Sequence, residues 1–201
     1  MIVTGIDAVT KQKYKVELDG QLAFVLYKGE LARYHIRVGE ELGSSQYDEI
    51  TNVVLLKRAK KYLLHLLTKM DRTTYELRTK LKKGFYPDSV IEQAIDYVAS
   101  YGYVDDEDYA KRYLRTYEGR LSLRQIKWKL KSKGIPKDIL EALDEQRTCY
   151  DDSRLIEKHI EKKVKGRTEL DAKELKKIAD FLYRKGFESS DIWESLKKYN
   201  P

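Results

Sequence analysis

One local signal recurs three times at equal spacing, and it limits the possible folds of this chain more than any other feature. A residue that caps helices stands three positions before a glutamate or glutamine at Thr73, Ser122 and Asp171, with 49 residues from each site to the next. In such a capping box the two residues accept hydrogen bonds from each other's backbone N–H groups, which marks a helix start. Three starts at a constant interval predict a structural repeat of about fifty residues.

Each predicted helix also carries the same stop signal, a Lys-Gly pair followed by an apolar residue. The three stops are Lys83-Gly84-Phe85, Lys133-Gly134-Ile135 and Lys185-Gly186-Phe187. Glycine after the last turn can adopt the left-handed conformation that ends a helix, and lysine complements the negative end of the helix dipole. We therefore predict left-handed glycines at all three stops.

A further helix follows each stop, and another precedes each capping box. Apolar pairs four residues apart predict the following helices: Ile91/Ile95, Ile139/Leu143 and Ile192/Leu196. The preceding helices are predicted at about 53–69, 106–118 and 152–164. Each group of three helices is too small to bury a large core alone, so neighbouring groups are expected to stack into an elongated, curved array. The three-helix repeats are placed at 53–103, 104–149 and 150–201.

The first 52 residues have a different pattern. A strand-like run at 14–18 and an apolar run at 22–27 flank Asp19-Gly20, which is a strong hairpin signal, and residues 2–9 are expected to pair alongside. Gly39 and Gly43 with Ser44-Ser45 predict a loop. The fold class is therefore mainly α, with a small β-hairpin arm and linker over residues 1–52.

Charge follows the same division. Residues 1–52 hold six Lys/Arg against eight Asp/Glu, whereas residues 53–201 hold 34 against 25. No apolar run exceeds the six residues 22–27, which is too short to span a membrane. The single cysteine, Cys149, excludes an internal disulfide and is interpreted as an unreactive thiol. We expect a cytoplasmic protein with no membrane contact.

The sequence offers no recognisable enzyme. It contains neither common phosphate-binding glycine motif, and its three histidines lie far apart without metal-ligand spacing. The acidic cluster at 105–108 has two interpretations, a divalent-metal site or a helix start in which Asp105 is the cap and the other acids occupy the first turn. The helix start is favoured, so no catalytic residue, metal or cofactor is predicted.

Positive charge is concentrated in the second repeat. Between Lys111 and Lys133 there are nine lysines and arginines against the single acid Glu118. Trp128 lies nearly opposite the apolar face of its predicted helix, where it could stack on a ligand or pack on the next repeat. The run favours a surface for a polyanion, although lysine-rich faces are often only solvated. Candidate binding residues are Arg72, Arg78, Lys80, Lys82 and Lys83 in repeat one, and Lys111, Arg112, Arg115, Arg120, Arg124, Lys127, Trp128 and Lys131 in repeat two.

Several motifs resemble those of a known family. These are Gly102-Tyr103-Val104-Asp105-Asp106 followed by Tyr109-Ala110, Asp71-Arg72-Thr73 with Glu76-Leu77 and Lys80-Leu81, and two of the Lys-Gly stops. Together they resemble the RecX family, bacterial regulators of the RecA recombinase. The resemblance covers about residues 58–199.

The resemblance implies a protein of tandem three-helix repeats that is not an enzyme. It implies binding in the groove of the RecA–DNA filament, with restraint of its ATPase and strand-exchange activities in recombination, DNA repair and the SOS response. Expected partners are the RecA filament and single- and double-stranded DNA, with a monomer as the expected state. Arg112, Arg115, Arg124, Lys127 and Lys131 would carry most of the electrostatic attraction.

Two departures from the family pattern leave alternatives open. Leu81 stands three residues before Gly84, whereas Leu130 and Leu182 stand four before their glycines, so the second helix of repeat one is expected to be altered. The N-terminal arm lies outside the resemblance, and its role is open. The alternative functions are a free-standing, helix-turn-helix-like DNA-binding protein that acts without RecA, and a pure protein scaffold.

Overall fold

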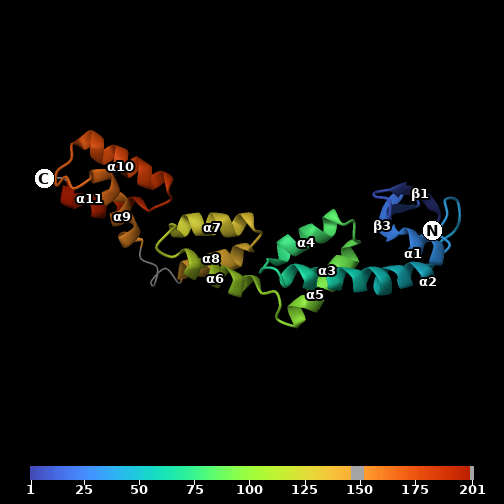
Figure 1. The fold of residues 1–201 in the computed structure, drawn as a ribbon. Helices are drawn as coiled ribbons and strands as arrows, with labels where there is room; N and C mark the ends of the chain where they lie inside the picture. Colours follow the sequence, from blue (N-terminus) through green and yellow to red (C-terminus); the bar gives the residue numbers. More distant parts are fainter. Residues whose placement is uncertain (146–151, 200–201) are drawn as a thin grey trace. The chain divides into compact units, whose positions relative to one another are not determined.

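The computed structural model describes residues 1–145 and 152–199, so Cys149 falls outside the described residues. The chain divides into two compact units, Met1–Asp105 and Asp106–Pro201, which are described separately. Figure 1 follows the elements along the chain. No helix among the described residues is long and apolar enough to cross a membrane.

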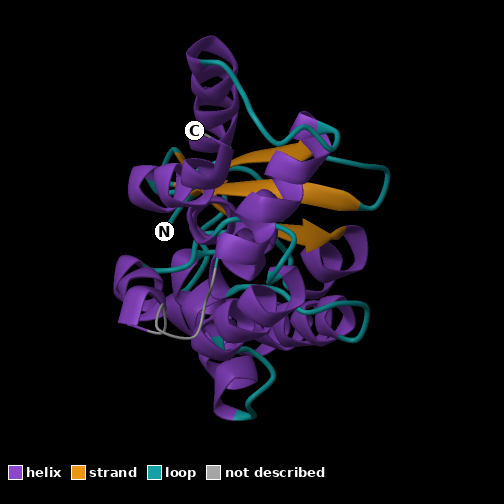
Figure 2. Ribbon diagram, turned by 90° about the vertical axis from the view of Figure 1, so that its left-hand side faces the viewer, coloured by secondary structure: helices purple, strands orange, loops and turns teal. Residues whose placement is uncertain are grey.

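The first unit opens with a three-stranded antiparallel sheet. Strands β1 (Val3–Ala8), β2 (Lys13–Leu18) and β3 (Gln21–Tyr27) lie side by side in the order β1-β2-β3 (Figure 2). Asp19 and Gly20 join β2 to β3 with φ values of 49° and 79°, as a two-residue type I′ turn requires. The predicted hairpin and its neighbouring strand are confirmed.

The segment after the sheet differs from the prediction, because it is largely helical. A short helix, α1 (Lys28–Arg33), follows β3, and a second, α2, starts at Ser44 where a loop was expected. α2 (Ser44–Glu49) continues through a π-helical segment, η1 (Ile50–Leu55), into α3 (Leu56–Leu67). The helix predicted to begin near residue 53 thus begins nine residues earlier, with Gly43 as its N-cap.

The π-helical segment explains why the sequence pattern did not predict the true start of this helix. Ile50 and Leu55 are both fully buried although they stand five residues apart, and Ala59 and Leu63 continue the buried face at intervals of four. An i→i+5 turn brings residues five apart onto one face, whereas the ordinary helical period does not. The boundary expected at residue 52 therefore falls inside a continuous helix.

Repeat one shares its core with the sheet. α3, α4 (Thr74–Lys83) and α5 (Asp88–Ser100) form the three helices of this repeat. Val16, Phe24 and Leu26 of the sheet belong to the same buried cluster as leucines of α3 and α4. The N-terminal sheet is therefore packed onto repeat one as part of one unit.

The second unit contains two further three-helix repeats, each with its own core. Repeat two comprises α6 (Asp106–Tyr117), α7 (Leu123–Ser132) and α8 (Lys137–Glu145). Repeat three comprises α9 (Ser153–Val164), α10 (Ala172–Arg184) and α11 (Ser189–Leu196), followed by a 3₁₀ turn, η3 (Lys197–Tyr199). The prediction of three tandem three-helix repeats with a small N-terminal sheet is confirmed.

All three capping boxes are present. The side chains of Thr73, Ser122 and Asp171 accept hydrogen bonds from the backbone N–H groups of Glu76, Gln125 and Glu174. In each box the side chain of the second residue also accepts the N–H of the first. Local sequence chemistry thus sets the start of the second helix in every repeat.

The helix stops agree with the prediction in two repeats and differ in the first. Gly134 and Gly186 are left-handed, with φ values of 77° and 86°. Gly84 has φ −84°, so the prediction of a left-handed glycine is wrong there, and Phe85 takes that conformation at φ 58°. A side-chain carbon on Gly84 would lie 2.9 Å from the Tyr86 ring, so this position needs glycine for close packing.

The backbone hydrogen bonds at the three stops are nevertheless the same. The N–H groups of Phe85 and Tyr86 donate to the carbonyls of Lys82 and Leu81 at 2.9 and 3.3 Å. The equivalent bonds of repeat two and repeat three run from Gly134 and Ile135 and from Gly186 and Phe187. Each stop is therefore a Schellman motif, in repeat one with phenylalanine at the glycine position.

Candidate functional site

Helix α6 positions the first part of the predicted basic surface. Its inward face carries Ala110, which is fully buried, with Tyr109, Tyr113 and Tyr117 partly buried beside it, as predicted. The rings of Tyr113 and Tyr117 lie 4.5 Å apart between centroids, and burial raises the pKa of the Tyr113 hydroxyl. These tyrosines therefore fix one face of the helix, and its cations project from the others.

The acidic cluster lies at the start of α6. The helix begins at Asp106, directly after Asp105, and carries three acids in its first turn, as the favoured interpretation predicted. Glu107 pairs with Lys111 at 2.5 Å, and Asp108 pairs with Arg112 at 2.8 Å. The charges of these two cations are thus offset by acids one turn earlier in the same helix.

Four cations of repeat two differ from that pair. Arg115, Arg120, Arg124 and Lys131 are exposed, and within the described ranges none of them has a carboxylate partner. Lys127 is only partly exposed. The structure thus separates the predicted strip into paired cations on α6 and available cations that extend from α6 to α7.

Trp128 lies among the available cations. Its side chain is 69% exposed, which agrees with its predicted position opposite the buried Leu123, Ile126 and Leu130. Together with Arg124 it lines a hollow of about 380 Å³, whose other wall comes from α10 and its end. None of these further residues was predicted as a binding residue: Tyr183, Arg184, Lys185 and Gly186.

The hollow lies where repeat two meets repeat three. The Ser122 hydroxyl, fully buried, donates a hydrogen bond of 2.7 Å to the carbonyl of Lys185. Tyr183 is 58% exposed, so two aromatic side chains and three cations border one solvent-accessible depression. The pair Tyr183-Arg184, directly before the Lys185-Gly186-Phe187 stop, is the signal that could have identified this wall.

The basic residues of repeat one are also separated by the structure. Arg78 makes two hydrogen bonds to Glu92, at 2.9 and 2.7 Å, and this contact holds the pKa of Glu92 below its usual value. Lys82 pairs with Asp88 at 3.4 Å. Both therefore tie α4 to α5, whereas Lys80 and Lys83 line a cavity on another side of the helix.

Arg72 takes a different position from the rest of this set. It precedes the Thr73 cap, and its Nε atom is buried without a hydrogen-bond partner. It is therefore a less accessible contact for a partner than the lysines of α4.

The family motif around residue 103 joins two helices. Gly102 ends α5 with φ 70°, and the N–H of Tyr103 donates to the carbonyl of Val98 at 3.0 Å. Val104 is buried, whereas Tyr103 is exposed and stacks on Tyr101 at 5.9 Å between ring centroids. Asp105 and Asp106 then lead into α6, so the motif encodes a helix stop followed by a helix start.

Comparison with known proteins matches one family model to each of the three-helix repeats. Family models described as the first, second and third three-helix domains of RecX match residues 59–97, 105–143 and 151–196. A protein from Caldanaerobacter subterraneus subsp. tengcongensis described as "Regulatory protein RecX" is 30% identical over 199 residues, which cover 98% of each chain.

Solved structures with the same fold support this assignment. A crystal structure of regulatory protein RecX has a TM-score of 0.65, with 26% identity and 98% coverage of both chains. RecX from Lactobacillus salivarius matches in fold, with a TM-score of 0.63 over 73% of this chain and 97% of its own. The descriptions of these relatives support a regulatory role, and the three matched domains and the full-length relative show that the chain belongs to the RecX family.

Proposed function

We propose that this protein regulates the RecA recombinase by binding the RecA–DNA filament and restraining its ATPase and strand-exchange activities. The proposal places it in the cytoplasm, as a monomer that acts in recombination, DNA repair and the SOS response. One observation carries it beyond family membership. Repeat two holds four exposed cations without carboxylate partners among the described residues, and an exposed tryptophan lies between two of them.

These side chains suit a surface rich in phosphate. Arginine and lysine neutralise phosphates and release counterions, and an exposed indole can stack on an unpaired base. A helix of twelve residues such as α6 is about 18 Å long, so a repeat can contact several phosphates of one strand. Occupation of the filament groove would hinder the subunit rearrangement that accompanies ATP turnover and block entry of a second duplex.

The test is single-strand-dependent ATP hydrolysis by the cognate RecA, with the protein titrated from well below equimolar amounts. We expect inhibition by the wild-type chain and its loss in the double variant Arg124→Glu with Lys131→Glu. The matched control is Lys173→Glu with Lys177→Glu, which makes the same charge change at exposed positions of α10. Helical content measured by circular dichroism should be equal in all three proteins.

The outcomes separate the candidate functions. Equal inhibition by the Arg124/Lys131 variant and its control would remove the basic surface of repeat two from the proposal. Absence of inhibition by the wild-type chain, together with tight binding to bare DNA, would favour a free-standing DNA-binding protein. Such binding would lose about 0.9 log units of affinity per phosphate contact for each log unit of salt.

A further inference from the structure

A second basic and aromatic site lies in the first unit, between the sheet and repeat one. A cavity of about 500 Å³ opens there, within the range of about 300 to 1,000 Å³ that is usual for small-molecule sites. Four cations line it: Lys13 of β2, Arg58 of α3, and Lys80 and Lys83 of α4. No acidic side chain is among the residues that line it.

Three of these cations are available to an anion. Arg58 is held by the carboxylate of Glu30 and by the carbonyl of Val25, so its charge is offset. Lys13, Lys80 and Lys83 have no carboxylate partner in the part of the chain that the structure describes. On α4 the paired cations therefore face α5, whereas the two lysines without partners border the cavity.

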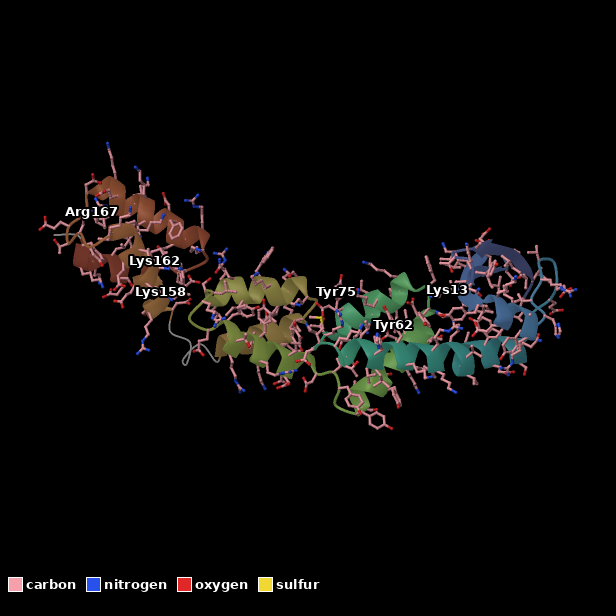
Figure 3. The ribbon with its side chains drawn as sticks, in the orientation of Figure 1. Lys13, Tyr62, Tyr75, Lys158, Lys162 and Arg167 are labelled. Atoms are coloured by element: carbon pink, nitrogen blue, oxygen red, sulfur yellow. The ribbon has the colours of Figure 1, made fainter. Side chains whose placement is uncertain are left out.

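Aromatic rings make up much of the remaining wall: Tyr27, Tyr62, Phe85 and Tyr86. Tyr27 and Tyr62 are 38% and 36% exposed, so ring surface is accessible from the cavity side or the solvent. The Arg58 guanidinium lies 4.5 Å from the centroid of Tyr27, which holds that ring in place. Figure 3 labels two residues of the cavity, Lys13 at the sheet and Tyr62 on α3.

The backbone of Phe85 is strained at this wall. Its φ of 58° is rare for a bulky residue, and the equivalent positions of repeats two and three are the glycines Gly134 and Gly186. The Lys15 ammonium lies 4.2 Å from the centroid of the Phe85 ring, so the ring is turned toward the sheet. Strain of this kind is concentrated at functional sites, which gives a second reason to assign binding to this cavity.

We propose that this cavity binds a nucleoside phosphate. Lys13, Lys80 and Lys83 contact the phosphate oxygens, and the base packs against the rings of Tyr27 and Tyr62. The ligand is either a free nucleotide or one nucleotide unit of a single strand, since both present the same chemistry. An acidic peptide would use the lysines and leave the tyrosine rings without a planar partner. The inference goes beyond the proposed function, because this binding needs neither RecA nor repeat two.

The test uses the full-length protein without RecA. Thymidine monophosphate, a hexathymidylate strand, pyrophosphate and hexaglutamate are titrated while the tyrosine ring signals are followed by NMR. We expect both thymidine probes to shift ring signals and to compete with each other. Tighter binding of the strand identifies a single-strand site, and equal or tighter binding of the mononucleotide identifies a free-nucleotide site. Equal affinity for pyrophosphate or hexaglutamate would overturn the proposal.

Variants assign the two halves of the site. Lys80→Ala with Lys83→Ala should weaken binding of thymidine monophosphate by at least about tenfold, as expected for loss of charge-assisted hydrogen bonds. The control, Lys57→Ala with Lys61→Ala on the exposed side of α3, should change it by less than about twofold. Tyr62→Leu should weaken thymidine monophosphate and leave pyrophosphate affinity unchanged. An unchanged affinity in the Lys80/Lys83 variant would overturn the assignment.

Discussion

Repeats one and three end their second helices with the same pair of backbone hydrogen bonds, but with different residues at the left-handed position. Repeat three has Gly186 there, and a side-chain carbon on it would lie 3.1 Å from the Ser122 hydroxyl oxygen. Repeat one has Phe85, whose ring borders a cavity. The comparison teaches that the hydrogen bonds define the stop, whereas the residue at the left-handed position depends on what packs around it.

The largest effect is expected from Gly186→Ala. The new side-chain carbon would meet Ser122 and Arg124 at 3.1 and 3.2 Å, and φ 86° disfavours any L-residue. We expect a loss of about 2 to 3 kcal/mol in the free energy of unfolding, measured by urea titration. Gly166→Ala is the control, because φ is 83° there and nothing lies within 4 Å of the new carbon. Equal losses at both sites would show that packing at the stop contributes nothing.

Gly84→Ala tests the counterpart in repeat one. The φ of −84° suits alanine, so a loss must come from packing, in which the new carbon would lie 2.9 Å from the Tyr86 ring and 3.2 Å from the Leu81 carbonyl oxygen. We expect about 1 to 2 kcal/mol of destabilisation in urea titration. The loss should be smaller when the same change is made in a Tyr86→Ala background, where only the contact with the Leu81 carbonyl oxygen remains. An undiminished loss there would contradict the contact with the ring.

At position 85, the glycine variant should be more stable than the alanine variant. Glycine relieves the left-handed strain of about 1 kcal/mol, whereas Phe85→Ala keeps the strain and removes the ring. The glycine variant should therefore be about 1 kcal/mol more stable than the alanine variant by thermal or urea unfolding. Both should bind thymidine monophosphate more weakly than the wild-type chain does. Equal stability of the two variants would show that the backbone of Phe85 is not strained.

The smallest effect concerns pH. His159 lies with its ring centroid 5.9 Å from that of Phe187, at the stop of repeat three, and burial together with Lys185, Lys162 and Lys158 lowers its pKa. The unfolded chain therefore binds the proton first, so stability is fully present above about pH 6.5 and falls as the pH drops toward the folded-state pKa. Urea midpoints at pH 7.5 and 5.5 should differ less in His159→Gln than in the wild-type chain. An identical pH difference in both would exclude His159 as the cause.

The sequence predicted the repeats because their signals are local. A capping box needs only residues three apart, so Thr73, Ser122 and Asp171 could be read without any tertiary information. The shift of the left-handed residue from Gly84 to Phe85 could also have been predicted. Leu81 and Phe85 stand four residues apart, as Leu130 and Gly134 do in repeat two. Gly84 suggested the wrong position for the left-handed residue, because the prediction relied on the residue type and not on the four-residue interval from the preceding leucine.

The parts that escaped prediction depend on non-local packing or unusual periods. The π-helical segment between Ile50 and Leu55 breaks the period on which helix prediction relies. The cavity of repeat one joins Lys13 to Lys80 and Lys83, nearly seventy residues away, and no local pattern connects them. In repeat two, by contrast, the pairing of Lys111 with Glu107 follows the i,i+4 rule and could have been predicted.

The Ser122 side chain accepts one hydrogen bond and donates another. Its oxygen receives the Gln125 N–H at the start of α7, and its proton goes to the Lys185 carbonyl at the end of α10. Aspartate starts helices as well as serine does, yet a carboxylate has no proton to give and would face a carbonyl oxygen. Serine meets both demands with a single oxygen atom. A repeat with aspartate at this cap, as repeat three has at Asp171, can start its second helix in the same way but cannot donate this bond to a neighbouring repeat.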